Sequence, residues 1–370
     1  MIPKKNILVI GRDSSAAVVD SQLYRRIKLY AQYHQFTFVV MNKGGAQVVM
    51  VDSAKVILPG GAILPVAFVK AFWYGYKELK SGDYNLVTTQ DALYAGIVGW
   101  ILSRLFKLPL FLQMHGDYLD NERWFSSNVG TFNRAMNHVG IFVLKRAEYV
   151  RAVSSRLRTQ LIKNYKLIPE RVISIPIGTN LELFKTSNTT SRGKVLLFAQ
   201  RLLPEKCPML FAEVVTTAMK NHSNVTVAIA GDGILKEDLV NYFTHEGVID
   251  RVVFHGAVPQ EKLVELYQQS FVYIHTADWE GWGMPMIEAM AAGCPVVTTD
   301  TGCAGEAVRH NETGLVTAIN DTEALIHEVE RLLTDKALWN KLSTQGVIEA
   351  EQWSFDTLAR KNMEWYANEN

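Results

Sequence analysis

Short apolar runs alternate with longer amphipathic stretches along the whole chain. Runs of four to six apolar residues bounded by polar residues or glycine are typical of strands buried on both faces of a parallel sheet. Stretches with apolar positions three or four residues apart are typical of helices that cover such a sheet. The first half predicts strands at 7–10, 36–40, 48–51, 85–88 and 110–113 and helices at 21–33, 66–79, 92–106, 132–145 and 155–165.

The second half repeats this alternation. Its apolar runs predict strands at 195–199, 225–230, 252–254, 272–276 and 295–299. Its amphipathic stretches predict helices at 208–220, 234–245, 261–270, 286–292, 322–333 and 336–351. Because parallel strands need a crossover connection that is usually a helix, we predict an α/β fold with one doubly wound, Rossmann-like domain in each half. Such domains bind ligands beyond the carboxyl ends of their strands.

A polar segment separates the two halves of this 370-residue chain, which is long enough for two domains. Residues 185–193 read Lys-Thr-Ser-Asn-Thr-Thr-Ser-Arg-Gly and show no apolar periodicity, as expected of a linker. We therefore predict an N-terminal domain at 1–185 and a C-terminal domain at 193–350. The remaining segment, 351–370, contains an amphipathic and aromatic stretch at 355–366 that predicts a terminal helix.

The formal net charge of +1 hides a division between the halves. Residues 1–185 carry 24 Lys and Arg and 12 Asp and Glu, a net of +12, whereas residues 186–370 have a net of −11. A basic first half suits an anionic membrane surface or a phosphorylated acceptor, and a merely solvated basic surface fits equally well. Nucleic acid is disfavoured because no basic groove interleaved with aromatic residues is visible. The basic residues singled out are Arg25, Arg26, Lys28, Arg104, Lys107, Arg151, Arg156, Arg158, Lys163 and Lys166.

The cysteines and the hydropathy indicate the compartment. Three cysteines provide neither a disulfide framework nor a paired C-x-x-C zinc site. The apolar run after the first two lysines is too short for a signal-peptide core, and no run reaches the roughly 18 apolar residues of a transmembrane helix. We expect a cytoplasmic protein, either free or peripheral on the inner face of the membrane.

The segment from Glu280 to Glu288 carries the most informative pattern. It reads Glu-Gly-Trp-Gly-Met-Pro-Met-Ile-Glu and leads from a predicted strand end into a predicted helix. Gly281 and Gly283 let backbone approach a ligand closely, and free N–H groups at a helix start suit a phosphate. Glu288 would accept both hydroxyl protons of a ribose cis-diol, and Glu280 would face another part of the same ligand. Either glutamate alone would also fit a helix start, where its charge complements the dipole.

These residues and the Ala-Gly-Cys-Pro-Val-Val that follows resemble the signature of family 4 retaining glycosyltransferases. The resemblance covers the second half and, more loosely, the first. It implies the GT-B fold, in which two doubly wound Rossmann-like domains face a cleft and a terminal helix crosses back to the first domain. It also implies that Glu288 binds the donor ribose and that Glu280 contacts the transferred sugar. Trp282 stands where the family commonly has Phe. The backbone implied to bind the donor diphosphate and sugar belongs to Gly283, Met284, Pro285 and Met286.

Arg201 and Lys206 flank Leu-Leu-Pro-Glu directly after the predicted strand 195–199, which places both at its carboxyl end. The chain has no Asp-x-Asp motif to bring a divalent metal to a diphosphate, so fixed cations would neutralise the leaving nucleoside diphosphate. Arginine offers a bidentate fork and lysine a point charge. An exposed loop pair would fit the same residues, but the family has Arg and Lys at this place and spacing. We expect no metal and no cofactor besides the nucleotide-sugar co-substrate.

His115 and Asp117 follow the predicted strand 110–113 in Met-His-Gly-Asp. Histidine is well suited to donate or shuttle a proton near neutral pH, although a lone histidine is more often structural. The resemblance implies that His115 contacts the donor sugar and that Asp117 orients it or meets the acceptor. With Glu280, Arg201 and Lys206, His115 completes the predicted catalytic set.

The turn after the first strand departs from the family pattern. It reads Gly-Arg-Asp-Ser-Ser-Ala from Gly11, whereas many relatives carry a pair of glycines there. It is also not Gly-x-Gly-x-x-Gly, which disfavours a dinucleotide-binding dehydrogenase. Gly11, Arg12 and Ser14 are therefore candidates for acceptor-side contacts only.

Two further loops resemble family sites. Gly231 and Asp232 follow the predicted strand 225–230 and fit either a nucleotide-side loop or an ordinary tight turn. Glu306 matches a family acid, although Cys303 replaces the usual glycine, and a role at a helix start suits it better.

Together these features predict a retaining glycosyltransferase that moves a hexose-type sugar from a nucleotide-sugar donor to a glycan or lipid-linked acceptor. Cell-envelope polysaccharide or glycolipid synthesis is the expected setting. Two rivals stay open. A nucleotide-sugar epimerase of related fold would form an epimer from the donor alone, and a catalytically silent sugar-nucleotide-binding scaffold would bind donor without turnover.

Overall fold

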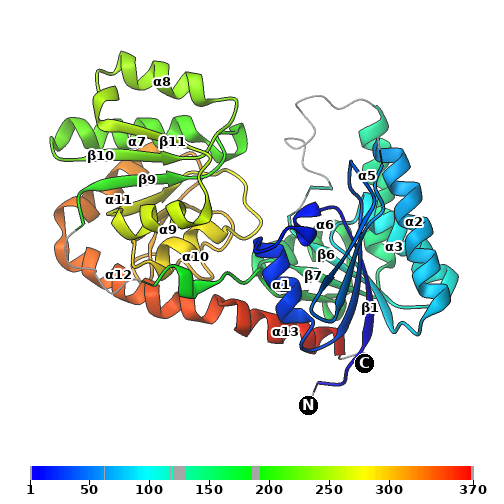
Figure 1. Ribbon diagram of the computed structural model, residues 1–370. Coiled ribbons are helices and arrows are strands. Elements are labelled where there is room, and N and C mark those ends of the chain that lie inside the picture. The colour runs from blue at the N-terminus through cyan, green and yellow to red at the C-terminus, as the bar shows by residue number, and fades with distance from the viewer. Residues whose placement is uncertain (1, 62, 117, 120–130, 186–191, 368–370) are drawn as a thin grey trace. The chain divides into compact units, whose positions relative to one another are not determined.

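The chain forms two α/β units, each built on its own sheet (Figure 1). The computed structural model describes residues 2–61, 63–116, 118–119, 131–185 and 192–367. The first unit comprises Met1–Pro176 together with Asp356–Asn370, and the second comprises Ile177–Phe355. The chain therefore changes unit at Pro176, before the polar segment 185–193, whose described ends belong to the second unit.

The first sheet has eight strands, all parallel to their neighbours except for one antiparallel hairpin. Their spatial order is β3 (Gln47–Val51), β4 (Ala54–Leu58), β2 (Gln35–Val40), β1 (Asn6–Gly11), β5 (Leu86–Thr89), β6 (Leu110–Met114), β7 (Tyr149–Ala152) and β8 (Val172–Ser174).

The hairpin corrects one expectation from the sequence. We expected 48–51 to be a buried parallel strand, but β3 is an edge strand that pairs antiparallel with β4, a strand the apolar pattern did not predict. Val48 and Met50 are accordingly 57% and 58% exposed. Asp52, with φ of 51°, supplies the left-handed residue that the tight connection needs.

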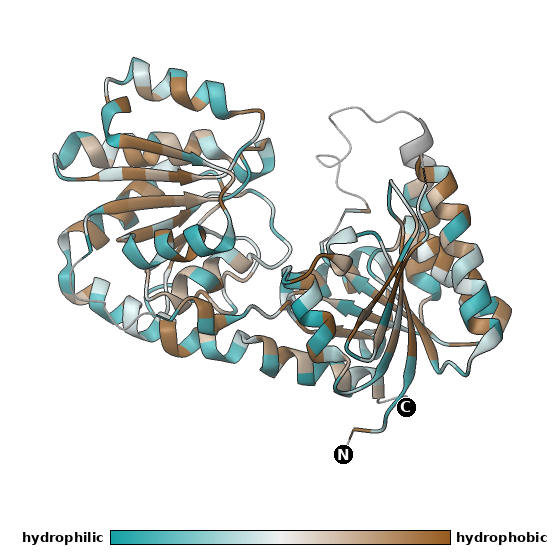
Figure 2. Ribbon diagram, viewed as in Figure 1, coloured by the Kyte–Doolittle hydropathy of each residue, from teal (hydrophilic) through white to brown (hydrophobic). Residues whose placement is uncertain are grey.

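Helices cover both faces of this sheet. Figure 1 shows α2, α3 and α5 on one side, with α1 and α13 on the other, and Figure 2 shows apolar residues both along the strands and on the helices that cover them. Among its described residues, the first unit has the helices α1 (Gln22–Tyr30), α2 (Leu64–Ser81), α3 (Tyr94–Phe106), α5 (Thr131–Arg146), α6 (Ser155–Tyr165) and α13 (Phe355–Ala367).

The last helix, α13, is part of the first unit's core. Met363 and Tyr366 pack in one apolar cluster with Phe36 of β2 and Phe111 of β6. The Tyr366 hydroxyl also accepts a hydrogen bond from Nε2 of Gln113 at 3.0 Å. The end of the chain thus completes a core that its beginning builds.

Arg151, which the sequence suggested for a basic surface, is instead buried in the middle of β7 with 3% of its surface exposed. Its guanidinium donates to the carbonyls of Ile175 (2.8 Å) and Pro176 (2.7 Å) and to Oε1 of Gln113 (2.9 Å). These bonds satisfy donors that burial would otherwise leave unpaired. Arg151 therefore anchors the backbone where the chain leaves the first unit and contributes no charge to the surface.

The second sheet has six strands, all parallel. Their spatial order is β11 (Val252–Gly256), β10 (Thr226–Ala230), β9 (Val195–Ala199), β12 (Val272–His275), β13 (Val296–Thr299) and β14 (Leu315–Thr317). The helices of this unit are α7 (Pro208–Asn221), α8 (Lys236–His245), α9 (Gln260–Gln269), α10 (Met284–Ala291), α11 (Thr322–Thr334) and α12 (Lys336–Ala350).

Both sheets reverse their strand order at one point. In the second sheet the chain runs outward from β9 through β10 to β11 and then returns to place β12 on the other side of β9. The first sheet reverses in the same way between β1 and β5. Helices that follow adjacent strands then leave toward opposite faces, and the space above the carboxyl ends of the two strands is a binding crevice. The second crevice receives the residues after β9 and β12.

Because α13 completes the first core, Met363→Ala should cost about 2–5 kcal/mol of unfolding free energy, the usual range for truncating a fully buried methionine. Met363 has 0% of its surface exposed. Arg360→Ala on the same helix is the matched control, because the side chain of Arg360 is 72% exposed and pairs only weakly with Glu364. Urea unfolding followed by circular dichroism measures both. Equal stability of the two variants would contradict this packing of α13.

Candidate active site

An ion pair lies at the crevice of the second sheet. Lys206 follows β9 in a short turn, and Glu280 lies in the loop between β12 and α10. Lys206 Nζ is 2.7 Å from Glu280 Oε2, and the two side chains are only 10% and 18% exposed. Thr276 Oγ1 donates to the carbonyls of Lys206 and Cys207, both at 3.0 Å, which joins the two loops. The fold thus brings together two predicted catalytic residues 74 positions apart.

The pair determines the charge state of Glu280. Burial alone would raise the pKa of this carboxyl group, but Lys206, His275 and the backbone N–H of Gly281 hold the pKa below its ordinary value. The Gly281 N–H donates to Glu280 Oε1 at 3.2 Å. Glu280 is consequently an ionised carboxylate with both oxygens directed by neighbouring groups.

Glu288, on the second turn of α10, has the opposite environment. It is 4% exposed, and burial raises its pKa to about 7. The hydroxyl of Thr179 donates to Glu288 Oε1 at 3.4 Å and acts in the other direction. Thr179 lies just after the point where the chain enters the second unit, 109 residues from Glu288, so no sequence motif could have linked the two.

The start of α10 offers fewer N–H groups than the sequence suggested. Gly283 is the N-cap residue and has a φ of 92°, a left-handed conformation that favours glycine. Pro285 has no N–H, and the Met286 N–H already donates to the Gly283 carbonyl at 3.0 Å. Of the four residues predicted to bind diphosphate, Gly283 and Met284 are therefore the ones whose N–H groups remain for a ligand.

The loop after β10 closes against the loop after β9. Gly231 has a φ of 148°, and a Cβ there would lie 1.8 Å from the carbonyl oxygen of Gln200. The Leu202 N–H donates to the carbonyl of Asp232 at 2.9 Å. Gly231 is required by this close backbone approach, and Asp232 acts within it through its main chain.

Arg201 differs from Lys206. Its side chain is 68% exposed, and its guanidinium lies 3.7 Å from Glu205 Oε1 in a loose ion pair. It shares the carboxyl end of β9 with Lys206 but is not part of the buried pair.

Glu306 lies in the loop after β13. Its backbone N–H donates to the Cys303 carbonyl at 3.0 Å, and the Cys303 N–H donates to the carbonyl of Trp282 at 2.7 Å.

Within the described part of the chain, buried polar atoms without a hydrogen-bond partner recur around this crevice. An unpaired buried polar group costs about 1–3 kcal/mol, so each one needs a physical explanation. They are both amide atoms of Gln200, Trp282 Nε1, His275 Nε2 and Thr301 Oγ1.

The remaining predicted residues lie in the first unit. Gly11 ends β1, where a Cβ would approach Oε1 of Gln90 to 2.5 Å. The Arg12 guanidinium lies over the Tyr94 ring at 4.7 Å, and Ser14 is exposed in the short turn that follows. Asp117 falls outside the described residues.

His115 follows β6 and lines a small cavity of about 30 Å³ together with Arg26 and Arg151. Burial, Arg151 and Arg26 lower its pKa to about 3. Its imidazole is therefore neutral at physiological pH and offers one N–H donor and one acceptor. This environment favours a hydrogen-bonding role over the proton donation that the sequence suggested.

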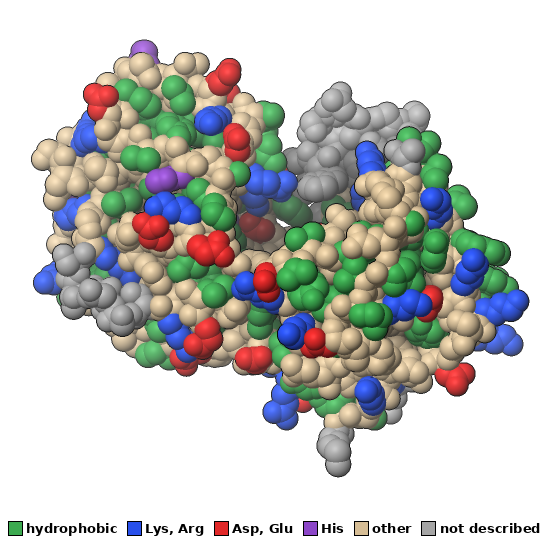
Figure 3. Space-filling model, viewed as in Figure 1, with side chains coloured by type: hydrophobic (Ala, Val, Ile, Leu, Met, Phe, Trp, Pro, Cys, Tyr) green, Lys and Arg blue, Asp and Glu red, His purple; other side chains and the backbone are tan. Residues whose placement is uncertain are grey.

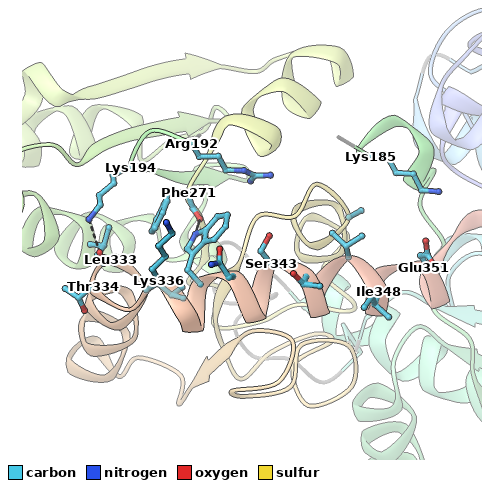
Figure 4. Close-up of a pocket in the computed structure, with 16 residues that line it drawn as sticks. Lys185, Arg192, Lys194, Phe271, Leu333, Thr334, Lys336, Ser343, Ile348 and Glu351 are labelled. Carbon is cyan, nitrogen blue, oxygen red and sulfur yellow. Dashed lines mark hydrogen bonds between the residues drawn. The ribbon is translucent and has the colours of Figure 1, made fainter. Parts of the chain in front are cut away.

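A cavity of about 1100 Å³ lies at the opposite, amino-terminal end of the second sheet (Figure 4). None of the predicted site residues lines it. Arg192 donates there to the carbonyls of Tyr267 and Ser270 at the end of α9 and to that of Ala292 at the end of α10. Lys194 donates to the Leu333 carbonyl. These two half-buried cations thus stabilise the ends of helices that border the cavity.

The described residues offer neither a metal cluster nor a membrane span. No group of three or more His, Cys, Asp or Glu side chains among them is arranged to hold a metal ion. None of their helices combines the length and the apolar character needed to cross a bilayer.

Comparison with known protein families gives one match on each side of about residue 180. Residues 27–183 match the family described as Glycosyltransferase Family 4, and residues 180–347 match the family described as glycosyl transferases group 1. The D-inositol 3-phosphate glycosyltransferase of Streptomyces bingchenggensis is 25% identical over 319 residues, which are 81% of this chain and 69% of that protein.

Two further proteins extend the comparison. The UDP-Gal:alpha-D-GlcNAc-diphosphoundecaprenol alpha-1,3-galactosyltransferase of Escherichia coli is 25% identical over 278 residues, 71% of this chain and 70% of its own. The crystal structure of Anabaena HepE in complex with UDP and glucose superposes with a TM-score of 0.76 at 20% identity, covering 98% of this chain and 99% of HepE. This last likeness is one of fold and establishes the GT-B architecture.

The environment of Glu288 predicts a pH dependence. Because its pKa is about 7, the carboxylate that would accept ribose hydroxyls is lost as the pH falls below 7. The affinity for a nucleotide-sugar, whose diphosphate diester does not titrate there, should weaken about tenfold between about pH 8 and about pH 6. Isothermal titration calorimetry measures this change. The Glu288→Gln variant should bind weakly and without this pH dependence, and a pH-independent wild type would contradict the assignment.

Proposed function

The chain belongs to glycosyltransferase family 4, whose members retain the anomeric configuration of the sugar they transfer from a nucleotide-sugar, and we propose that its donor is a UDP-hexose and its acceptor a lipid-linked glycan. The observation that carries the proposal is the buried Lys206–Glu280 pair at the switch point of the second sheet, together with the buried Glu288 on the helix that follows. A cation and two carboxylates in unlike environments suit a ligand that combines phosphates with hydroxyl groups.

Two of the compared proteins support the donor and acceptor classes. HepE has been crystallised with UDP and glucose, and the E. coli relative is named for a UDP-Gal donor and a diphosphoundecaprenol acceptor. The Streptomyces relative is named for D-inositol 3-phosphate, a phosphorylated cyclitol, so phosphorylated compounds recur in the names of the relatives.

The proposed reaction assigns one task to each group. The Glu288 carboxylate accepts the ribose hydroxyls, and the N–H groups of Gly283 and Met284 donate to the diphosphate. Lys206, with Arg201, stabilises the charge that develops on the departing diphosphate as its bond to the anomeric carbon breaks. The acceptor oxygen bonds to that carbon on the same face, and its proton passes to the departing phosphate oxygen. Glu280 holds the sugar hydroxyls in position.

This assignment predicts transfer from a UDP-hexose in EDTA, with the donor's anomeric configuration preserved in the product. Lys206→Met should lower kcat by about 10²–10³, as expected when one group that stabilises the transition state is lost. Lys336→Met, an exposed lysine at the other end of the unit, is the control and should match wild type. Chromatography of labelled product and proton NMR of its anomeric signal provide the measurements.

Three results would contradict the proposal. A strict requirement for an added divalent metal would remove the role given to the fixed cations. Formation of an epimer from the donor alone would identify an epimerase. Donor binding without transfer to any member of a panel of lipid-linked and free glycans would identify a scaffold.

An apolar stripe on α2 supports action at a lipid surface. Val66, Val69 and Trp73 follow one another at helical spacing and are 40%, 64% and 52% exposed. Lys70 and Lys77 are exposed beside them, with Lys77 Nζ 5.2 Å from the centre of the Trp73 ring. Figure 3 shows hydrophobic and basic side chains side by side over this helix, at the right-hand edge of the molecule. An apolar face flanked by lysines is typical of helices that lie in a membrane interface.

The charge of the unit suits an anionic leaflet. Each lysine near such a surface contributes about 1 kcal/mol of attraction, and long lysine side chains reach headgroups while their stems stay on apolar surface. We propose that α2 binds the first unit to anionic lipid. The buried Arg151, one of the basic residues that the sequence suggested for a membrane surface, contributes nothing to it. The proposed surface instead includes exposed lysines of α2.

In a flotation assay, wild type should rise with liposomes that contain anionic phospholipid and remain behind with neutral ones. The Val69→Ser/Trp73→Ser variant removes much of the apolar area that would be buried in the bilayer, and it should reduce the floated fraction about tenfold. Val253→Ser/Ile348→Ser, at two residues of the second unit that are 53% and 56% exposed, is the matched control and should float like wild type. Equal flotation of all three proteins, or of none, would overturn the membrane proposal.

A further inference from the structure

His275 ends β12 with 0% of its surface exposed, five residues before Glu280. Its Nδ1 lies 3.1 Å from the hydroxyl of Tyr273, which is also fully buried. Its Nε2 has no hydrogen-bond partner among the described residues and lies 3.8 Å from Glu280 Oε2. A buried histidine with one nitrogen occupied and the other aimed at a site carboxylate is not explained by packing alone.

The surroundings determine where the proton of this imidazole lies. Burial lowers the pKa of His275 to about 4, with Glu280 raising it and Lys206 lowering it further, so the ring is neutral. A neutral ring carries one N–H. If Nδ1 accepts the Tyr273 hydroxyl proton, the N–H lies on Nε2 and faces the carboxylate of Glu280. The other tautomer would set a lone pair against that carboxylate, which is repulsive.

We propose that His275 is a positioning residue for Glu280. Its Nε2–H, oriented by the Tyr273 hydroxyl, directs Oε2 jointly with Lys206, while the Gly281 N–H directs Oε1. The separation of 3.8 Å exceeds a hydrogen bond, so contact requires a small approach of the carboxylate as the sugar binds. This inference rests on the proposed function, because it assumes that Glu280 contacts the transferred sugar.

A purely structural role would not need this residue. The interior of a strand end is normally filled by apolar side chains, and an unpaired Nε2 there carries a desolvation cost. That cost is offset only if the N–H meets a partner during the working cycle, and Glu280 is the charged group that it faces. Groups that hold a functional side chain in orientation commonly affect activity about 10–100-fold, as second-shell partners of metal ligands do.

Two amide variants separate the two nitrogens of the ring. In His275→Asn the amide occupies the region of Nδ1 and loses the group that faces Glu280. In His275→Gln the longer side chain carries an N–H donor into the region of Nε2. We expect His275→Asn to lower kcat about 10–100-fold with little change in UDP affinity, and His275→Gln to restore most of that loss. Tyr273→Phe removes the hydroxyl that fixes the tautomer of His275, so its kcat should lie between those of His275→Asn and His275→Gln.

The pH profile distinguishes positioning from loss of structure. Among the described residues, the titratable groups that interact with Glu280 are Lys206, His275, Tyr273 and Cys303. Of these, His275→Asn removes only the imidazole, whose Nε2–H faces Glu280 Oε2 and favours the ionised carboxylate once the two atoms come into contact. The acid limb of kcat should therefore move to higher pH in His275→Asn and return in His275→Gln. A variant that is merely less stable would unfold at lower temperature without moving this limb.

Glu280→Gln separates the failure of this inference from failure of the proposed function. If Glu280→Gln turns over like wild type, the role proposed for Glu280 is wrong. If Glu280→Gln is inactive while His275→Asn keeps both the kcat and the acid limb of wild type, the positioning role of His275 is wrong. A lower kcat in His275→Asn with an unmoved acid limb, or no recovery in His275→Gln, would also overturn it. If His275→Asn does not fold, the acid limb of kcat is compared between Tyr273→Phe and His275→Gln instead.

Discussion

The site depends on a single buried ion pair, between Lys206 Nζ and Glu280 Oε2 at 2.7 Å. Two charges taken from water are tolerated only when they are well paired, because breaking such a pair by removing one partner costs about 3–5 kcal/mol. The strand order supplies the condition for pairing, because β9 and β12 are neighbours in space although β10 and β11 separate them in sequence. The loop after each strand then contributes one partner.

The same edge holds two glutamates whose environments differ. Lys206 keeps Glu280 ionised, whereas Glu288 is buried without a comparable cation, and its pKa rises to about 7. Two carboxylates with separated pKa values are suited to two tasks. One remains a fixed charge beside a cation, and the other is an acceptor whose strength follows the pH. Thr179 and His275 each contact or face one of them.

Much of this arrangement could be predicted from the sequence, because it depends on local patterns. Apolar runs and amphipathic stretches located most strands and helices, and the segment from Glu280 to Glu288 indicated the site. What failed depends on contacts between distant residues. The pattern missed β7 because Arg151 interrupts its apolar run, and burial of that arginine is possible only because backbone carbonyls and Gln113 surround it.

The two supporting residues escaped prediction for the same reason. Thr179 lies in a connection without a motif and meets Glu288 only in the folded chain. His275 reads as one more residue of an apolar strand, and its exceptional character appears only when its unpaired Nε2 is seen beside Glu280. Sequence motifs reveal the side chains that touch a ligand. The side chains that hold those groups in position become visible only in the structure, through burial and unsatisfied polar atoms.

The most direct test of the account is a thermal-shift comparison of wild type with the Lys206→Met/Glu280→Gln double variant, with and without a UDP-hexose. Replacing both partners by neutral residues of similar size leaves no unpaired charge, so the double variant should unfold near the wild-type temperature. Donor at 100 times its dissociation constant should stabilise wild type by about 2.7 kcal/mol and the double variant far less. Equal stabilisation of both proteins would show that neither Lys206 nor Glu280 contacts the bound donor and would contradict the account.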